Sequence, residues 1–269
     1  MMMKKKFVRI LKIALIIYLV VGMALYFFQE KLLFHPTILT KDYAFNFKDS
    51  FTEQTIKYDS STAYCLVKFH TQDTAKGVVL YFHGNRGNIE RYERFVKNFT
   101  KHGYEVWMMD YPGFGKSTGL LNEQMLYEES VQVYKLAKVF YKPENIVIYG
   151  KSLGTGIAAQ LASRRDCKRL ILETPYYDII SAAEHYAWMY PVSWMMKYNI
   201  PTYQYLQKVT APITIFHGTS DEVISYSSAS KLKTVLKPGD EFITLTGGNH
   251  RNLNSFPLMQ QKLDSLLSL

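Results

Sequence analysis

A serine between two glycines follows a short apolar run near the middle of the chain. The run Ile146–Tyr149 is β-branched and has no polar alternation, which is typical of a strand buried on both faces of a parallel sheet. The next residues, Leu153–Ser163, are mostly small and favour a helix that packs closely on that sheet. A strand that turns into a helix within a few residues needs glycine on both sides of the residue at the apex. The segment Gly150–Gly154, with Ser152 at its centre, therefore predicts a nucleophile elbow rather than an ordinary glycine-rich turn.

A serine hydroxyl is a weak nucleophile at neutral pH and needs a histidine base that a carboxylate orients. Of the seven histidines, only His250 lies in a glycine-rich loop after the last predicted strand, and Asp221 directly follows the strand before it. The chain order serine, acid, histidine is one of the orders known for such triads. We therefore expect Ser152 to be the nucleophile, Asp221 the acid and His250 the base. Glu222 and Asp178 remain alternative acids.

Two backbone N–H groups must point at the oxygen that becomes negatively charged during attack on a carbonyl. The residue after the nucleophile, Leu153, predicts one donor. The second is expected from the loop after an early strand, where Asn85 is the first candidate and Arg86 the alternative. Gly84 would let this loop approach closely. The same loop also serves as a turn into a helix that Asn88 caps, and the two roles are compatible.

Strands and helices alternate along most of the chain. The predicted strands are Gln54–Tyr58, Ala63–Phe69, Gly77–Phe82, Tyr104–Met109, Ile146–Tyr149, Arg169–Leu172, Ile213–Phe216 and Phe242–Leu245. The predicted helices are Ile89–Lys101, Asn122–Phe140, Leu153–Ser163, Ser225–Leu236 and Leu253–Leu267. The first two strands pair around a polar turn, and the repeated strand–loop–helix units predict an α/β fold with a mostly parallel sheet covered on both faces. The loops at the carboxyl ends of its strands are the expected place for the chemistry.

The segment 174–206 interrupts this alternation and is rich in aromatic residues and methionine. It follows a strand whose carboxyl end should lie near the site, which makes it a candidate lid. An apolar lid would suit an acyl chain, but aromatic helices packed on a core have the same composition. Both interpretations stay open.

An apolar segment near the N-terminus, Ile10–Phe28, is interrupted only by Lys12. As a helix it is roughly 28 Å long, which matches the hydrocarbon thickness of a bilayer. Lys4, Lys5 and Lys6 precede it, so the positive-inside rule predicts a single-pass membrane protein with a cytoplasmic N-terminus and an extracytoplasmic domain.

The alternative is a cleaved signal peptide, since Gly22–Ala24 resembles a cleavage site. The apolar run continues to Phe28, where a cleavage region should turn polar, and this favours an uncleaved anchor. We expect two parts: a membrane anchor at residues 1–30 and one globular domain at residues 31–269.

Composition narrows the possible partners. The chain has 269 residues and a net charge of +9, of which Lys4, Lys5, Lys6, Arg9 and Lys12 near the N-terminus contribute +5. No stripe of Lys and Arg interleaved with aromatic residues is visible, so we expect no nucleic-acid partner. The two cysteines, Cys65 and Cys167, do not have the spacing of metal ligands, and neither a metal nor a cofactor is expected. They are expected to be free thiols, although a disulfide stays possible outside the cytoplasm.

Five segments, "HGNRGN", "DYPGFGKSTG", "GKSLG", "HGTSDEVI" and "GGNH", together resemble the α/β-hydrolase superfamily. The closest resemblance is to membrane-anchored serine hydrolases related to the serine aminopeptidase-like group, lysophospholipases and protein depalmitoylases, over roughly residues 25 to 268. The resemblance implies an α/β-hydrolase fold with a short lid. It also implies Ser152, Asp221 and His250 as the triad and the backbone of Asn85 and Leu153 as the oxyanion hole.

The expected activity is therefore cleavage of an acyl ester, carboxylic or thio, through an acyl-enzyme, with a small-molecule or lipid substrate. A serine peptidase of the aminopeptidase-like type is one alternative, and an acidic pocket for a substrate amino terminus would be its sign. A binding module that uses the fold without turnover is the other.

Overall fold

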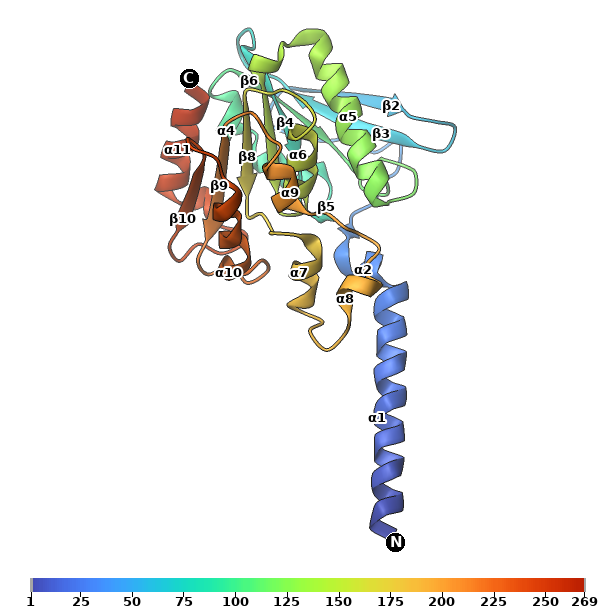
Figure 1. Cartoon of the computed structure of the whole chain (residues 1–269). Coiled ribbons are helices and arrows are strands. Elements are labelled where there is room, and N and C mark those ends of the chain that lie inside the picture. The colour runs from blue at the N-terminus through green and yellow to red at the C-terminus, as the bar shows by residue number, and fades with distance from the viewer. Residues whose placement is uncertain (1, 269) are drawn as a thin grey trace.

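An eight-stranded sheet forms the centre of the molecule (Figure 1). The computed structural model describes residues 2–268; Met1 and Leu269, the outer limits of the two expected parts, lie outside the described residues. The strand order is β10-β9-β8-β7-β4-β6-β3-β2. The strands are β2 (Phe51–Lys57), β3 (Ala63–Phe69), β4 (Gly77–Phe82), β6 (Tyr104–Met109), β7 (Ile146–Lys151), β8 (Arg169–Glu173), β9 (Ile213–Gly218) and β10 (Glu241–Leu245). A separate short pair joins β1 (His35–Pro36) to β5 (Arg86–Gly87).

The sheet is parallel from β10 to β6, and only β3 and β2 run antiparallel to their neighbours. Both faces of the central strands are buried, because alternate residues point to two separate apolar cores. In β7, for example, Ile148 belongs to one core and Val147 and Tyr149 to the other. This explains the unbroken apolar runs that predicted the strands, and the sheet matches the expected α/β fold.

Helices cover both faces. The longer helices are α5 (Glu123–Phe140), α6 (Leu153–Ala162) and α11 (Pro257–Ser268), and the shorter ones are α2 (Gln29–Leu33), α3 (Ile89–Tyr92), α4 (Lys97–Thr100), α7 (Ile179–Glu184), α8 (Val192–Met195), α9 (Thr202–Leu206) and α10 (Tyr226–Ala229). The apolar residues of α5 and α6 pack in one core, and those of α4 and α11 pack in the other. Figure 1 shows these helices on opposite sides of the sheet.

Three of the predicted helices are shorter or more broken than expected. The predicted helix Ile89–Lys101 contains a 3-10 turn at Glu93–Phe95, and Ser225–Leu236 is 3-10 from Ser230 onward. The last predicted helix is a 3-10 turn followed by α11, which begins at Pro257. Proline lacks the N–H that a continuous helix would need and fits its first turn instead, which explains this break.

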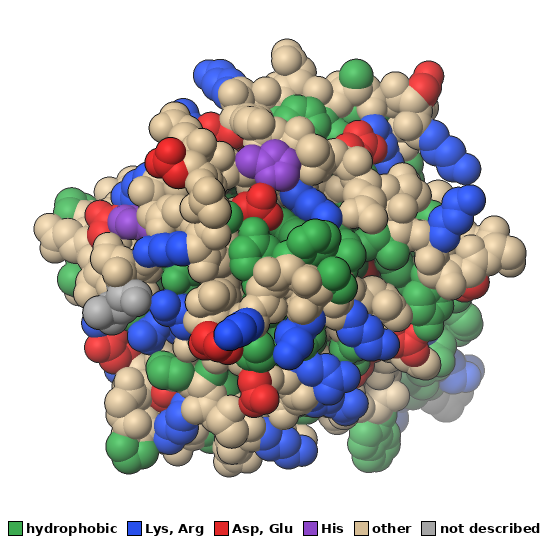
Figure 2. All heavy atoms as spheres, turned by 90° about the horizontal axis from the view of Figure 1, so that it is seen from above, with side chains coloured by type: hydrophobic (Ala, Val, Ile, Leu, Met, Phe, Trp, Pro, Cys, Tyr) green, Lys and Arg blue, Asp and Glu red, His purple; other side chains and the backbone are tan. Residues whose placement is uncertain are grey.

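Helix α1 (Met2–Phe27) extends away from the sheet as a single rod, and α7 and α8 lie on the same side of the molecule as its C-terminal end (Figure 1). By length and composition α1 can cross a membrane. Figure 2 shows the face seen from above, opposite α1, where acidic and basic side chains are interspersed. The disulfide that stayed possible from the sequence is not formed, because Cys65 and Cys167 are both free.

Candidate active site

Ser152 lies at the turn between β7 and α6, with φ 52° and ψ −117°. This left-handed conformation is strained for a residue with a side chain. A Cβ at Gly150 would lie 2.5 Å from the carbonyl oxygen of Gly154, and a Cβ at Gly154 would lie 2.7 Å from the carbonyl oxygen of His83. Ser152 N–H donates a 2.9 Å hydrogen bond to the carbonyl oxygen of Glu173, which ties the turn to β8. The two glycines therefore permit the sharp turn that presents Ser152 at the carboxyl edge of the sheet.

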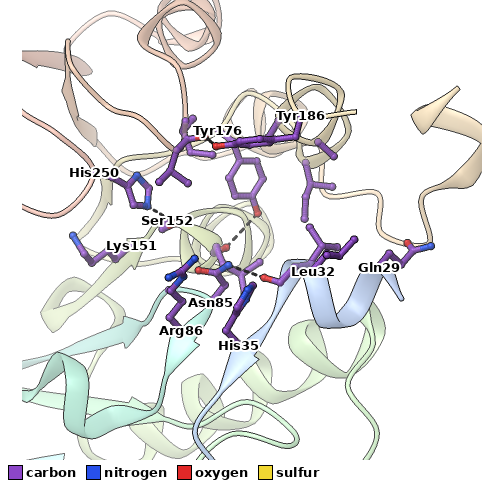
Figure 3. Close-up of a pocket in the computed structure, with 18 of the residues that line it drawn as sticks. Gln29, Leu32, His35, Asn85, Arg86, Lys151, Ser152, Tyr176, Tyr186 and His250 are labelled. Atoms are coloured by element: carbon purple, nitrogen blue, oxygen red, sulfur yellow. Dashed lines mark hydrogen bonds between the residues drawn. The ribbon is translucent and has the colours of Figure 1, made fainter. Parts of the chain in front are cut away.

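The structure brings Ser152, Asp221 and His250 together, although 98 residues separate Ser152 from His250. His250 Nε2 lies 2.9 Å from Ser152 Oγ, and the two side chains point toward each other (Figure 3). His250 Nδ1 lies 2.9 Å from Asp221 Oδ2 and 3.0 Å from Oδ1. A proton on Nδ1 is required to bond the carboxylate, which leaves Nε2 as the acceptor for the serine hydroxyl proton.

Asp221 is held by its own loop, where its Oδ1 accepts hydrogen bonds from Val223 N–H at 2.9 Å and Ile224 N–H at 2.8 Å. Burial raises the pKa of Asp221, but the hydrogen bond and charge of His250 and the bond from Ile224 outweigh it, and the net pKa is lowered. The carboxylate is therefore ionised at neutral pH. Nearby His217 is buried, which lowers its pKa, and its Nε2 donates to the Ile224 carbonyl oxygen at 3.0 Å.

The two alternative acids lie in other positions. Asp178 caps α7 by accepting a hydrogen bond from Ser181 N–H at 2.6 Å. Glu222 Oε2 accepts a 3.3 Å bond from the backbone N–H of His250, not from its ring. Asp221 is thus the carboxylate that contacts the imidazole.

The two expected oxyanion donors flank Ser152. Leu153 is the first residue of α6, so its N–H has no partner within the helix. Asn85 is fixed through its other polar groups: its carbonyl oxygen accepts a 2.9 Å bond from His35 N–H, and its Nδ2 donates to the Leu33 carbonyl oxygen at 2.6 Å (Figure 3). Among residues 2–268, no hydrogen bond uses the Asn85 N–H. Both residues line the cavity that opens beside Ser152.

His83, a buried histidine to which no role was assigned from the sequence, holds the loop that carries Asn85. His83 Nδ1 lies 2.7 Å from the carbonyl oxygen of Gly84, and Tyr111 Oη donates to the His83 carbonyl oxygen at 2.7 Å. A Cβ at Gly84 would lie 3.5 Å from that of Ser152. The loop is therefore both close to the serine and rigidly held.

A buried ion pair beneath the turn was also missed from the sequence. Lys151 Nζ donates to Glu173 Oε1, and both side chains are almost fully buried. Glu173 also accepts bonds from Tyr149 Oη at 2.6 Å and Asn254 Nδ2 at 2.9 Å. A polar residue at the end of each of two neighbouring apolar strands was the only available signal. The pair compensates the charge of Lys151, so this lysine contributes little net positive charge beside the serine.

A cavity of about 600 Å³ opens beside Ser152 and His250. One end is apolar and is formed by α1, α2, α7 and α8, including Leu25, Leu32, Leu33, Ile179 and Met195. The lining also includes four exposed arginines, Arg86, Arg91, Arg94 and Arg251. Figure 3 shows Arg86 near Ser152 and Leu32 and Gln29 on the far side.

The segment 174–206 lines the cavity in one part and packs in the apolar core in another, so both interpretations of its composition apply. Helices α7 and α8 line the cavity, whereas Tyr198, Ile200 and Leu206 belong to the apolar core under α5 and α6. We refer to residues 176–197, which include α7 and α8, as the lid.

Comparisons with known proteins agree with the fold. The family described as "Serine aminopeptidase, S33" matches residues 73–208, just over half of the chain. "Alpha/beta hydrolase domain-containing protein 17C" from Xenopus tropicalis is 29% identical over 196 residues, which are 71% of this chain and 61% of that protein. The chain thus spans less than two thirds of the length of that curated relative.

Solved structures share the fold at lower identity. An esterase from Pyrococcus furiosus has a TM-score of 0.68 and 17% identity, covering 87% of this chain and 97% of its own. A monoglyceride lipase from Saccharomyces cerevisiae, solved with a substrate analogue, has a TM-score of 0.63 and 17% identity, covering 83% of this chain and 98% of its own. The chain belongs to the serine aminopeptidase S33 family of the α/β-hydrolase superfamily.

Proposed function

We propose that the chain is a membrane-anchored serine hydrolase that cleaves acyl esters, carboxylic or thio, through an acyl-enzyme on Ser152. One observation carries the proposal: His250 Nε2 lies 2.9 Å from Ser152 Oγ while Asp221 holds the opposite ring nitrogen at 2.9 Å. This arrangement activates a serine hydroxyl and has no need of a further group.

In the proposed reaction, Ser152 Oγ forms a bond to the carbonyl carbon of the ester and its proton moves to His250 Nε2. The negative oxygen of the tetrahedral intermediate is bound by the N–H groups of Leu153 and Asn85. The bond to the leaving alcohol or thiol then breaks, and that group takes the proton from His250. Water next repeats the attack with His250 as the base, which releases the acid and restores the serine.

The cavity supports a lipid-like substrate. Its volume of about 600 Å³ and its apolar end suit a single acyl chain. The arginines in the lining would hold a negatively charged leaving group, since guanidinium groups bind phosphate and carboxylate in bidentate fashion. We therefore propose lysophospholipids or related single-chain esters as the preferred class.

The aminopeptidase-like alternative expected acidic residues near the serine for a substrate amino terminus. Of the described residues, those lining the cavity include four arginines but no Asp or Glu, and Lys151, which also lines it, is already paired with Glu173. This lining favours an anionic substrate over a cationic amino terminus.

The anchor part of the proposal, residues 1–30 with the hydrolase domain at 31–269, is supported by the exposure of α1. Apolar side chains on all sides of this helix are exposed, among them Leu11, Ile16 and Leu19 at 61%, 58% and 54%. Exposed apolar side chains on every side of a helix suit lipid rather than water. Lysines at its start support a cytoplasmic N-terminus and an extracytoplasmic domain.

The test is a series of p-nitrophenyl esters from acetyl to palmitoyl, measured with the full-length protein in detergent and with Ser152→Ala as the control. We expect kcat/KM to rise with chain length by a factor of about four per buried methylene until the cavity fills. A maximum at acetyl, with octanoyl and longer esters unreactive, would contradict the lipid substrate. Undiminished turnover by Ser152→Ala would contradict the nucleophile.

A further inference from the structure

One face of α1 differs from the rest of the helix. Tyr18, Gly22 and Leu25 share one face of α1, and Gln29, the first residue of α2, follows about one turn later, past the bend at Phe28. Gly22 and Leu25 are half-buried, whereas neighbours such as Val21 and Met23 are exposed. We refer to these four residues as the anchor stripe.

The anchor stripe contacts the lid at its first two positions. Tyr18 Oη donates to the carbonyl oxygen of Met189 at 2.8 Å, and Tyr190 Oη donates to the carbonyl oxygen of Tyr18 at 3.2 Å. The rings of Tyr18 and Tyr190 stack with centroids 4.5 Å apart. A Cβ at Gly22 would lie 3.1 Å from the Tyr190 ring, so the absence of a side chain at Gly22 lets this ring pack closely against the helix.

The last position of the stripe is a buried glutamine. Gln29 Nε2 donates to the carbonyl oxygens of Tyr26 at 2.8 Å and Met195 at 3.1 Å. Gln29 Oε1 accepts a 2.8 Å bond from Lys197 N–H. The amide nitrogen and oxygen of Gln29 are both paired, and the lid is thus joined to the anchor stripe at both ends of the stripe.

Between these two joints, Leu25 faces the cavity that contains Ser152. Leu32 and Leu33 of α2 line the same cavity, as do Ala183, Ala187 and Met195 of the lid. Figure 3 shows Gln29 and Leu32 on the side of the cavity away from His250. The apolar end of the cavity is thus formed by the membrane helix on one side and the lid on the other.

The lid also extends along the helix. Tyr18 precedes Phe28, the end of the apolar run, by about ten residues, or roughly 15 Å of helix. The tip of the lid carries Trp188 and Trp194, which are 77% and 88% exposed. Trp side chains are costly to expose to water and favour the membrane interface. With α1 in a bilayer, the lid therefore lies within the leaflet next to the hydrolase domain.

We propose that the anchor stripe and the lid form an intramembrane access route, through which the acyl chain of a bilayer lipid reaches Ser152 without passing through water. The inference rests on the proposed ester hydrolysis at Ser152. It assigns α1 to the substrate site as well as to membrane attachment, and it makes Leu25 a residue that determines acyl-chain specificity.

The test uses the full-length protein in phospholipid vesicles with Leu25→Trp. The larger side chain would fill the apolar end and exclude at least two methylenes, each of which contributes a factor of about four. We expect the ratio of kcat/KM for a dodecanoyl ester to that for an acetyl ester to fall at least tenfold. Met23→Trp is the matched control, because Met23 is exposed on the opposite side of the helix, and its ratio should equal that of the wild type.

An unchanged ratio in Leu25→Trp would overturn the access route while leaving ester hydrolysis intact. Absence of turnover of both esters by the wild type would instead overturn the proposed function and the access route with it.

A second measurement does not depend on activity. In vesicles of brominated phospholipids, tryptophan fluorescence of the wild-type protein should be quenched, and the double variant Trp188→Phe/Trp194→Phe should lose the quenched component. Trp107 is buried in the sheet and provides the unquenched reference. Equal emission of the wild type in brominated and ordinary lipids would overturn the insertion of the lid.

Discussion

Replacing Glu173 by glutamine should destabilise the domain strongly, because it leaves the buried ammonium of Lys151 without its charged partner. The two side chains are 0% and 8% exposed, respectively. Removing one member of a buried pair costs about 3–5 kcal/mol. For a domain of this size that loss lowers Tm by roughly 6 to 20 °C. Tyr149 and Asn254 would also lose a charged acceptor.

The assay is thermal unfolding of the full-length protein in detergent, followed by tryptophan fluorescence. Glu30→Gln is the matched control: Glu30 pairs with Lys197 at 3.0 Å, but both side chains are more than a third exposed, and such pairs contribute at most about 1 kcal/mol. The double variant Glu173→Gln/Lys151→Met should recover a large part of the lost stability, since no unpaired charge remains. A Tm for Glu173→Gln within about 2 °C of the wild type would refute the reasoning, because it would bound the loss at about 1 kcal/mol.

The other predictions concern the site and the topology. Asp221→Asn should lower kcat by about four orders of magnitude through loss of the imidazole orientation. The kcat of Asp178→Asn should stay near that of the wild type. The reverse result in the ester assay would identify Asp178 as the acid of the triad. Arg91→Gln should lower the preference for an anionic over a neutral single-chain ester of equal length about tenfold, whereas exposed Arg165→Gln should not; equal preferences in kcat/KM would remove the arginines from substrate binding. A reporter active only outside the cytoplasm should give signal when fused after Leu269. If that reporter is silent and one active only in the cytoplasm gives signal, the proposed topology is wrong.

The local parts of the site could be predicted from the sequence because each depends on nearby residues. The turn at Ser152 needs glycine on both sides, and apolar runs buried on both faces mark the parallel strands. Asp221 and His250 could be proposed because each follows a strand whose carboxyl end must lie at the same edge of the sheet. Their distances to one another could not, since these depend on how the loops after β9 and β10 reach across β8 to the end of β7.

Contacts between distant segments left no local pattern. The Lys151–Glu173 pair joins two strands, and either residue alone is an ordinary polar position at a strand end. The anchor stripe could not be recognised from the sequence, because Leu25 is as apolar as the exposed residues beside it in α1. Only its packing against the lid distinguishes it.

The most direct test of the proposed nucleophile is mass spectrometry of the full-length protein after reaction with a fluorophosphonate probe. The proposed mechanism predicts one phosphonylated residue, Ser152, because only its hydroxyl is deprotonated by His250 at 2.9 Å. Ser152→Ala should show no adduct and no ester turnover while keeping the thermal stability of the wild type. An adduct on another residue, or undiminished labelling and turnover in Ser152→Ala, would contradict the central claim.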